Sequence, residues 1–172
     1  MVRFIPVFGA GKGICFSIFH SVSAFCNAGF DLMGTYSGQY SSLAAFYDDS
    51  MVNIVVMLLI IVGGIGFFVW GDLQKNGFHW KKYMLHTKTV LFMTGFLVIL
   101  GTVLFLVFEK DNLLPGMDGK DRLLAAAFSS VTARTAGFNT IDTGKLTTAS
   151  KLLTGVLMLI GGNPGSTAGG VK

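Results

Sequence analysis

The chain contains the segment FHSVSAFCNAGF at residues 19–30 and a similar segment, FSSVTARTAGF, at residues 128–138. In both copies a short stretch of small and apolar residues leads to a glycine, Gly29 or Gly137, which a phenylalanine follows. Strongly apolar runs flank both copies, so we expect the repeated unit to lie inside a membrane. The repeat therefore predicts a duplicated short helix that ends in a glycine-centred turn.

The composition is that of a membrane protein. Of the 172 residues, 52% are hydrophobic, 13% are charged and 16 are phenylalanine. A soluble domain of this composition could not cover its apolar surface with polar groups. The net charge of +4 does not indicate a nucleic-acid partner, because several lysines lie together between two apolar runs, as in a membrane-topology signal. These are Lys75, Lys81, Lys82 and Lys88. We expect membrane lipid around the chain and no bound nucleic acid.

Three apolar runs are candidates for membrane-spanning helices. Met51–Trp70 and Thr89–Phe108 have about 20 residues each, the length that crosses a ~30 Å hydrocarbon layer. Leu152–Ile160 is shorter, and the sequence Gly-Gly-Asn-Pro-Gly at 161–165 stops it. Irregular backbone is tolerated at membrane depth only where protein or a water-filled cavity surrounds it. We therefore expect two continuous spans and a third that is broken, an interruption typical of functional segments.

The helices of the two repeats are too short to cross. Ile14–Phe25 and Leu123–Ala133 each have about a dozen residues, or ~18 Å of helix. This length is expected of a re-entrant pore helix, which enters the membrane and does not cross it. The predicted fold class is an all-α membrane protein built from span–pore-loop–span repeats, with re-entrant pore helices.

The charges between these segments set the expected orientation. Residues 71–88 contain four lysines and one acid, Asp72, so we predict that they form a cytoplasmic linker. Residues 31–50 and 109–122 should then face outward. We expect Glu109 and Asp142 to be solvated charges on that side.

A turn of this kind suits a dehydrated cation. A K⁺ ion in a bilayer needs oxygens that replace its water shell, and backbone carbonyls supply them without a fixed charge that would hold the ion too tightly. Glycine reaches the dihedral angles that aim successive carbonyls at one axis. The preceding helices would also turn the negative ends of their dipoles toward the ion. The expected filter carbonyls belong to Asn27, Ala28, Gly29, Thr135, Ala136 and Gly137.

Three neighbouring side chains are expected to brace this filter. Phe30 and Phe138 follow the two turns and would wedge them in place. Arg134 precedes the second turn, where a free cation would repel K⁺, so we expect it to pair with carbonyls behind the filter. One alternative stays open: the Ala-Gly-Phe turns only pack helices in a structural, non-conducting membrane protein.

The glycine-rich C-terminal segment offers another alternative, a nucleotide-dependent enzyme. Gly165 and Gly170 have the spacing of a phosphate-binding loop, but Val171 stands where that motif requires lysine and no strand precedes it. Residues 64–66 also lack the third glycine of a dinucleotide fingerprint, and we expect these glycines to allow close helix packing. We therefore do not expect an enzyme.

The sequence resembles the membrane subunit of the Trk/Ktr/HKT potassium-uptake superfamily, and KtrB-type proteins in particular. The two repeats carry this resemblance, together with the segments GGIGF at residues 63–67, LHTK at 85–88 and GGNPGSTAGGVK at 161–172. The resemblance covers essentially the whole chain.

The resemblance implies an arrangement of repeat units. Members of the superfamily place four span–pore-loop–span units around one pore in a single polypeptide. Residues 1–70 resemble the second unit from its pore helix onward, and residues 71–88 resemble the linker that follows. Residues 89–172 resemble the third unit as far as its broken second span. On this resemblance the chain is a fragment that lacks the first unit, the start of the second and the fourth.

The resemblance also implies a function and partners. It implies K⁺ uptake by a multi-pass protein of the bacterial plasma membrane, with K⁺ as the transported ion and no organic cofactor. The glycine-rich segment would be the intramembrane loop that gates permeation beneath the filter. The residues of this gate loop are Gly161, Gly162, Asn163, Gly165, Ser166, Thr167, Gly169 and Gly170. The implied partners are a second copy of the full-length subunit and a cytoplasmic nucleotide-binding ring of the KtrA kind.

Overall fold

The computed structural model describes residues 1–38, 41–77, 79–112 and 117–171. Within these ranges every regular element is a helix, so the all-helical prediction is confirmed. The longer helices are α2 (Ala10–Phe25), α4 (Ser50–Gly64), α6 (Leu85–Phe108), α7 (Gly119–Thr132) and α8 (Thr148–Ile160). The shorter ones are α1 (Phe4–Phe8), α3 (Gly34–Ser37) and α5 (Phe67–Asn76), with 3₁₀ turns at Ala44–Phe46, Trp80–Lys82 and Thr143–Lys145.

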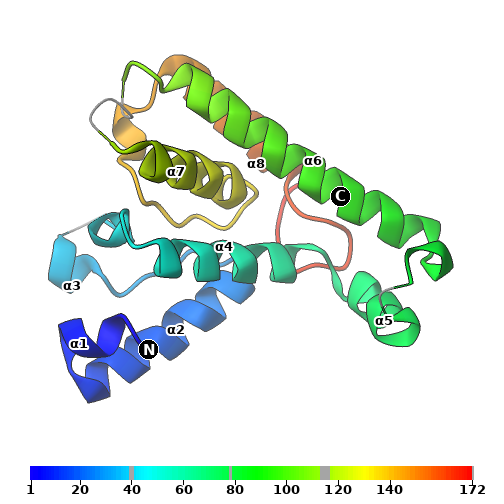
Figure 1. The fold of residues 1–172 in the computed structure, drawn as a ribbon, viewed down its shortest axis with the longest axis horizontal. Coiled ribbons are helices and arrows are strands. Elements are labelled where there is room, and N and C mark those ends of the chain that lie inside the picture. Colours follow the sequence, from blue (N-terminus) through cyan, green and yellow to red (C-terminus); the bar gives the residue numbers. More distant parts are fainter. Residues whose placement is uncertain (39–40, 78, 113–116, 172) are drawn as a thin grey trace.

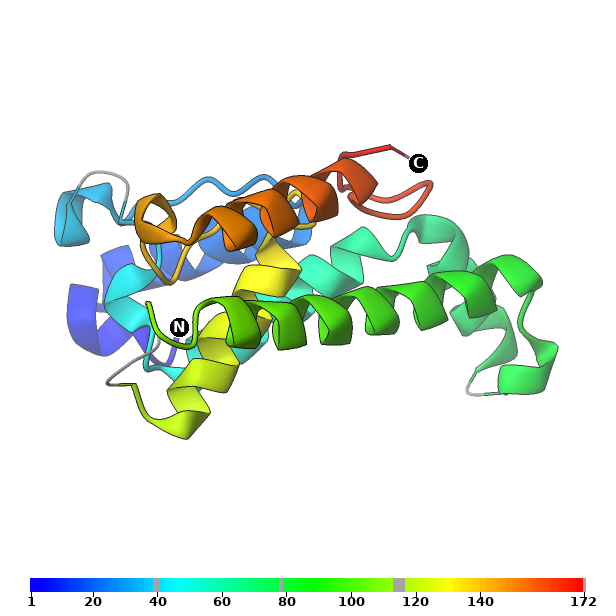
Figure 2. The same cartoon turned by 90° about the horizontal axis from the view of Figure 1, so that it is seen from above.

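Helix α7 lies at the centre of this arrangement. It packs against α4 on one side and α6 on the other, and α8 runs beside α6 (Figure 1). Figure 2 shows the same layers from above, with α7 crossing obliquely between its neighbours. The other repeat helix, α2, packs against α4 on the side away from α7. The helices of the two repeats therefore lie on different sides of α4.

The repeat helices are longer than the apolar runs within them. Helix α2 has 16 residues and begins at Ala10 instead of Ile14. Helix α7 has 14 residues and begins at Gly119 instead of Leu123. The extra turns carry polar residues, Lys12 in α2 and Asp121 in α7, which the hydrophobic pattern alone did not include. A carboxylate in the first turn of α7 also suits the helix dipole.

One predicted span is wrong as a continuous helix. The run Met51–Trp70 divides into α4 and α5, and the two helices form an angle of 93°. Gly66 lies at the bend with φ +95°, a conformation that ends an α-helix and that glycine adopts without a steric penalty. Because the residues on both sides are apolar, hydropathy gives no sign of the bend. Among the described helices, α6 alone is long and apolar enough to cross a membrane, with 24 residues.

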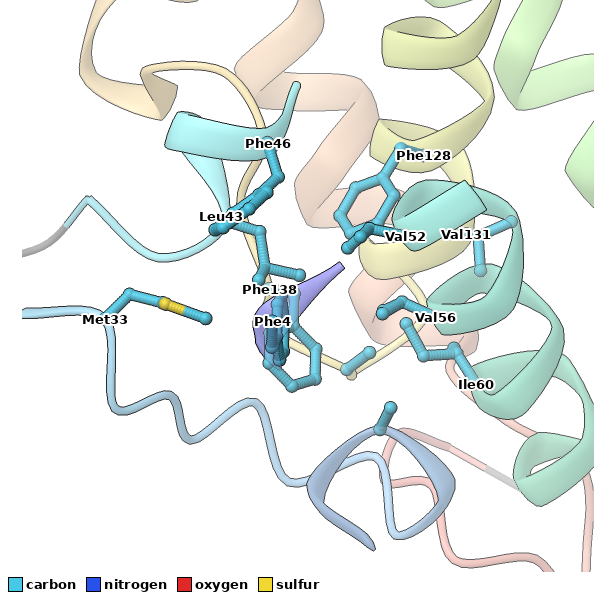
Figure 3. Close-up of a cluster of buried hydrophobic side chains, with 12 residues drawn as sticks. Phe4, Met33, Leu43, Phe46, Val52, Val56, Ile60, Phe128, Val131 and Phe138 are labelled. Carbon is cyan, nitrogen blue, oxygen red and sulfur yellow. The ribbon is translucent and has the colours of Figure 1, made fainter. Parts of the chain in front are cut away.

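Two clusters of buried side chains fix the position of α7. The first joins α7 to α4, α1 and the turn after α7 (Figure 3). It includes Phe4, Phe46, Val52, Val56, Ile60, Phe128, Val131 and Phe138. The second joins α7 to α6 and α8 through Leu97, Phe105, Ala126 and Leu157. Since α7 is buried on both sides, the turn that follows it is held at the centre of the molecule.

The expectation for Glu109 is wrong. Its side chain is only 1% exposed at the end of α6, where it accepts hydrogen bonds from the Thr147 amide at 2.9 Å and the Asn112 side chain at 2.7 Å. Burial acts to raise the pKa of Glu109, but hydrogen bonds from Ser150, Asn112 and Thr147 outweigh it, so the pKa lies below its usual value. The carboxylate thus ties the end of α6 to the start of α8.

Gly101 allows α6 and α7 to approach each other. A Cβ atom at this position would lie 2.3 Å from the Ser130 hydroxyl, which donates a hydrogen bond to the Val98 carbonyl at 3.0 Å. Small residues at helix contacts are common in membranes, where close backbone packing replaces the hydrophobic effect.

We predict that Gly101→Ala destabilises the protein by about 1–3 kcal/mol, because the added methyl overlaps the Ser130 hydroxyl. Gly95→Ala is the matched control, since it lies on the same helix and its Cβ would meet no atom within 4 Å. Thermal unfolding of the purified protein measures both. Equal melting temperatures for the two variants would contradict this account of the α6–α7 contact.

Candidate functional site

The two glycine turns contact each other through their backbones. A Cβ atom on Gly29 would lie 2.2 Å from the Ala136 carbonyl oxygen and 3.0 Å from the Gly137 Cα. On the other side, a Cβ on Gly137 would lie 3.5 Å from the Gly29 Cα. No side chain fits between the turns at Gly29. The structure therefore brings together the two segments that the sequence repeat singled out.

The turns also share one backbone pattern. Asn27 and Gly29 have φ values of +51° and +71°, and Thr135 and Gly137 have +73° and +88°. The middle residue of each turn, Ala28 or Ala136, does not have a positive φ. Each turn therefore has a positive φ at its first and third residues and not at the alanine between them. The repeat is thus a repeat of backbone geometry as well as of sequence.

The first residue of each turn is held in a conformation that few side chains adopt. Asparagine tolerates the left-handed region, but a β-branched residue such as Thr135 is strained there. Strain of this kind costs on the order of 1–3 kcal/mol and persists only where the surroundings impose it. Part of that restraint is visible, because the Thr135 hydroxyl accepts a hydrogen bond from the Gly169 amide at 2.9 Å.

Each turn is closed by a hydroxyl from the repeat helix that precedes it. The Ser23 hydroxyl donates to the Phe30 carbonyl at 2.8 Å, and the Thr132 hydroxyl donates to the Phe138 carbonyl at 2.6 Å. Ser23 and Thr132 occupy the same position in the two copies of the repeat. Sequence analysis missed them as site residues, although aligning the copies places a hydroxyl at this position in both.

The glycine-rich loop of residues 161–170, predicted above to be a gate loop, binds the first turn through Thr167. Its hydroxyl donates to the Phe25 carbonyl at 2.9 Å and accepts from the side-chain nitrogen of Asn27, Nδ2, at 2.9 Å. The backbone amide of Thr167 donates to the Gly63 carbonyl at 3.4 Å. One residue of the loop therefore connects the end of α2, the first turn and the end of α4.

The gate loop also binds the second turn. Besides the bond from the Gly169 amide to the Thr135 hydroxyl, the Arg134 Nε donates to the Gly161 carbonyl at 3.2 Å. Arg134 is 8% exposed, and this bond joins it to the start of the loop. The loop thus contacts both turns from one side.

The same loop supplies hydrogen-bond partners at the bend between α4 and α5. A continuous helix would pair the Phe67 amide with the Gly63 carbonyl, and the bend removes that bond. Instead, the Phe67 amide donates to the Gly165 carbonyl at 2.9 Å, and the Asn163 amide donates to the Gly64 carbonyl at 3.1 Å. The Asn163 side chain donates to the Gly64 carbonyl at 3.0 Å and to the Thr94 hydroxyl of α6 at 3.1 Å.

The neck of the gate loop is closed by backbone contact. A Cβ on Gly161 would lie 2.1 Å from the Gly169 carbonyl oxygen and 2.6 Å from the Gly170 Cα. The Gly162 amide donates to the same Gly169 carbonyl at 2.9 Å. Within the loop, the Ser166 hydroxyl donates to the Asn163 carbonyl at 2.5 Å. Small residues are therefore required at the neck for steric reasons.

The two phenylalanines that follow the turns lie in different surroundings. Phe138 is fully buried in the first cluster, whereas Phe30 is 71% exposed. A wedging role for Phe30 stays a prediction. Among the described residues, no group of three or more His, Cys, Asp or Glu side chains is placed to hold a metal ion. Any cation at this site would depend on carbonyl and hydroxyl oxygens.

We predict that Ser23→Ala and Thr132→Val each destabilise the protein by about 1 kcal/mol, because each removes the hydroxyl that closes a turn. Ser21→Ala is the control, since its hydroxyl bonds only to the Ser17 carbonyl within α2. Thermal unfolding again provides the measurement. The proposed role fails if the three variants unfold at the same temperature.

Comparison with known proteins identifies relatives of the chain. The sequence profile of the TrkH family, described as a cation transport protein, matches residues 4–172. The chain is 49% identical over 173 residues to the potassium/sodium uptake protein NtpJ of Enterococcus hirae. It is 40% identical over 176 residues to the Ktr system potassium uptake protein B of Vibrio alginolyticus. Each alignment covers 99% of this chain, which spans 37% of the length of either relative.

The fold is similar to that of the potassium transporter TrkH from Vibrio parahaemolyticus, determined by crystallography. The TM-score is 0.66 with 20% sequence identity, over 98% of this chain and 41% of that one. At this identity the likeness concerns the fold alone. The family profile, in contrast, spans nearly the whole sequence and includes both turns and the gate loop. The chain belongs to the TrkH family of cation transport proteins, which are membrane transporters and not enzymes.

Proposed function

We propose that this chain forms part of the wall of a potassium pathway in a bacterial plasma membrane. The carbonyls of residues 27–29 and 135–137 would serve as part of the filter. The observation that carries this proposal is the backbone contact between two turns with the same alternation of φ. The helices α2 and α7 end at these turns, so the negative ends of their dipoles favour a cation there.

The chain alone does not account for a whole pathway, because it spans 37% of the length of its relatives. We infer that the remaining wall comes from further repeat units of one polypeptide, and that the full-length subunit forms a homodimer. We place residues 71–88 on the cytoplasmic side, where the exposed Lys75, Lys81 and Lys82 would meet lipid headgroups or a KtrA-type ring. The name of one relative includes potassium and that of the other includes potassium and sodium, so the proposal is K⁺ transport and does not include strict exclusion of Na⁺.

We propose that residues 161–170 gate this pathway. Hydrogen bonds from the loop to Asn27 and Thr135 support a docked position against both turns. Withdrawal of the loop would remove the partners of Gly64 and Phe67 at the bend. Unpaired backbone groups cost several kcal/mol each in a membrane, so the loop and the α4–α5 bend should move together. A straightened α4–α5 helix would pair the Phe67 amide with the Gly63 carbonyl again.

The second candidate function is a structural role, in which the turns only pack helices. The fully buried Phe138 favours it, because a packing role needs nothing beyond that contact. The two functions differ in what happens when charge is added at the turns. A filter would lose ion discrimination, whereas a packing turn would lose only stability.

We predict that Gly29→Asp or Gly137→Asp, in a complete transporter that carries this segment, weakens the preference for K⁺ over Na⁺. Gly29→Asp should also lower K⁺ uptake, since its Cβ overlaps the Ala136 carbonyl and over-packing of this kind costs about 1–3 kcal/mol in stability of the turn. Growth rescue of cells that lack K⁺ uptake, together with ion fluxes at matched membrane expression, measures both effects. Gly34→Asp is the control, as a Cβ there meets no atom within 4 Å. Wild-type ion preference in both turn variants would exclude the filter.

We predict that Thr167→Val raises basal K⁺ flux, measured without the cytoplasmic ring. The variant loses the hydroxyl bonds to Asn27 and Phe25, each worth about 0.5–1.5 kcal/mol, so the docked loop is released more often. Thr89→Val is the isosteric control, because the Thr89 hydroxyl bonds only to the Leu85 carbonyl within α6. Unchanged or lower flux at equal expression would contradict a gating role for this contact.

A further inference from the structure

A small cavity lies behind the first turn, between the two repeats. Asn27, Arg134, Gly64 and Gly162 line it, together with apolar side chains of α4, α6 and α7. The centre of a water-sized sphere can occupy a volume of about 10 Å³ inside this cavity. Because this is the room left for the centre of the sphere, the cavity can hold a water molecule. The size of the cavity therefore restricts its occupant to a single small species.

Asn27, which lines this cavity, has a side-chain oxygen without a hydrogen-bond partner. Its Oδ1 atom is buried and has no hydrogen-bond partner among the described residues, and the residue is 8% exposed. The orientation of the amide is set by its nitrogen, which donates to the Thr167 hydroxyl at 2.9 Å and contacts the Ile60 carbonyl at 3.4 Å. Rotating the amide would place its oxygen against that carbonyl. A buried oxygen without a donor costs about 1–3 kcal/mol.

A donor-rich group shares the cavity with this oxygen. The guanidinium of Arg134 has five N–H donors, and the described contacts account for one bond, from Nε to the Gly161 carbonyl. Arg134 is 8% exposed, so bulk water does not solvate it freely. The backbone of Gly162 completes the polar part of the lining. The cavity thus presents an acceptor and a donor group to one small occupant.

We propose that a single structural water molecule binds here and bridges Asn27 and Arg134. A water molecule donates to the Asn27 Oδ1 and accepts from the guanidinium, which fits both groups. A cation is disfavoured because Arg134 carries positive charge, and an anion because Oδ1 offers only lone pairs. Buried waters of this type satisfy two to four polar groups and belong to the fold. The site does not depend on the proposed transport function.

The bridging water would connect the two repeats at a point where they share no direct side-chain bond. Asn27 belongs to the first turn, and Arg134 directly precedes the second. Arg134 in turn holds the Gly161 carbonyl at the start of the gate loop. The water therefore positions the first turn relative to both the second turn and the loop.

Gly64→Ala in the complete transporter tests this site. The nearest atom to a Cβ on Gly64 is the Asn27 Nδ2 at 4.0 Å, so the methyl causes no overlap and occupies cavity space. If the water is present, displacing it leaves Oδ1 without a donor, and we expect the melting temperature to fall by about 2 °C or more. In a dry cavity the methyl would fill space and raise the melting temperature, which would overturn the proposal. Gly155→Ala is the control, a helical glycine with no atom within 4 Å of its Cβ.

A map of the unmodified transporter that resolves ordered waters provides the second measurement. A peak within hydrogen-bond distance of both the Asn27 Oδ1 and the Arg134 guanidinium supports the proposal. A map that shows waters elsewhere at the same depth but no peak in this cavity overturns it, whatever the melting temperature of the alanine variant. The outcome is readable without ion flux, so it is separate from the test of the filter.

Discussion

Every peptide group at membrane depth needs a hydrogen-bond partner, and this constraint explains how the irregular segments of the chain are arranged. Among the interruptions of the described helices are those after α2, after α7 and between α4 and α5. At each place, side-chain hydroxyls or the gate loop supply bonds that a helix would otherwise provide. Ser23 and Thr132 close the two turns, and the amides and carbonyls of residues 163–167 pair with the groups freed at the bend.

These hydrogen bonds join segments that are distant in sequence. The loop of residues 161–170 holds the bend and the two turns at once, because Thr167 and Gly169 bind the turns while Asn163 and Gly165 bind the bend. The loop is itself anchored by the Arg134 bond to Gly161. A change at any one of these contacts therefore affects the others. Such shared bonding is what a gate needs if it is to have two discrete positions and not a continuous range.

The sequence predicts the parts of the fold that repeat or that depend on hydropathy. The two copies of the motif identify both turns and the helices α2 and α7 before them, and the apolar run before Phe108 identifies α6. The bend at Gly66 was not predictable in this way, because apolar residues continue through it and a glycine in such a run also suits helix packing. The burial of Glu109 depends on Thr147 and Asn112, which long-range folding brings to it. Aligning the two copies shows a hydroxyl at the position of Ser23 and Thr132, but only the structure shows that these hydroxyls bond to the carbonyls of Phe30 and Phe138.

The two copies are alike in backbone and different in packing, and this contrast bears on what the repeat is for. Both turns share the same signs of φ and the same closing hydroxyl. Their side chains diverge: asparagine corresponds to threonine at the first position, and the following phenylalanine is buried in one copy and exposed in the other. If the repeat served helix packing, the packed side chains should be the similar part, since interiors are sensitive to shape. The repeated part is instead the backbone of the turns together with the closing hydroxyl, and this favours the filter proposed above over a role in helix packing.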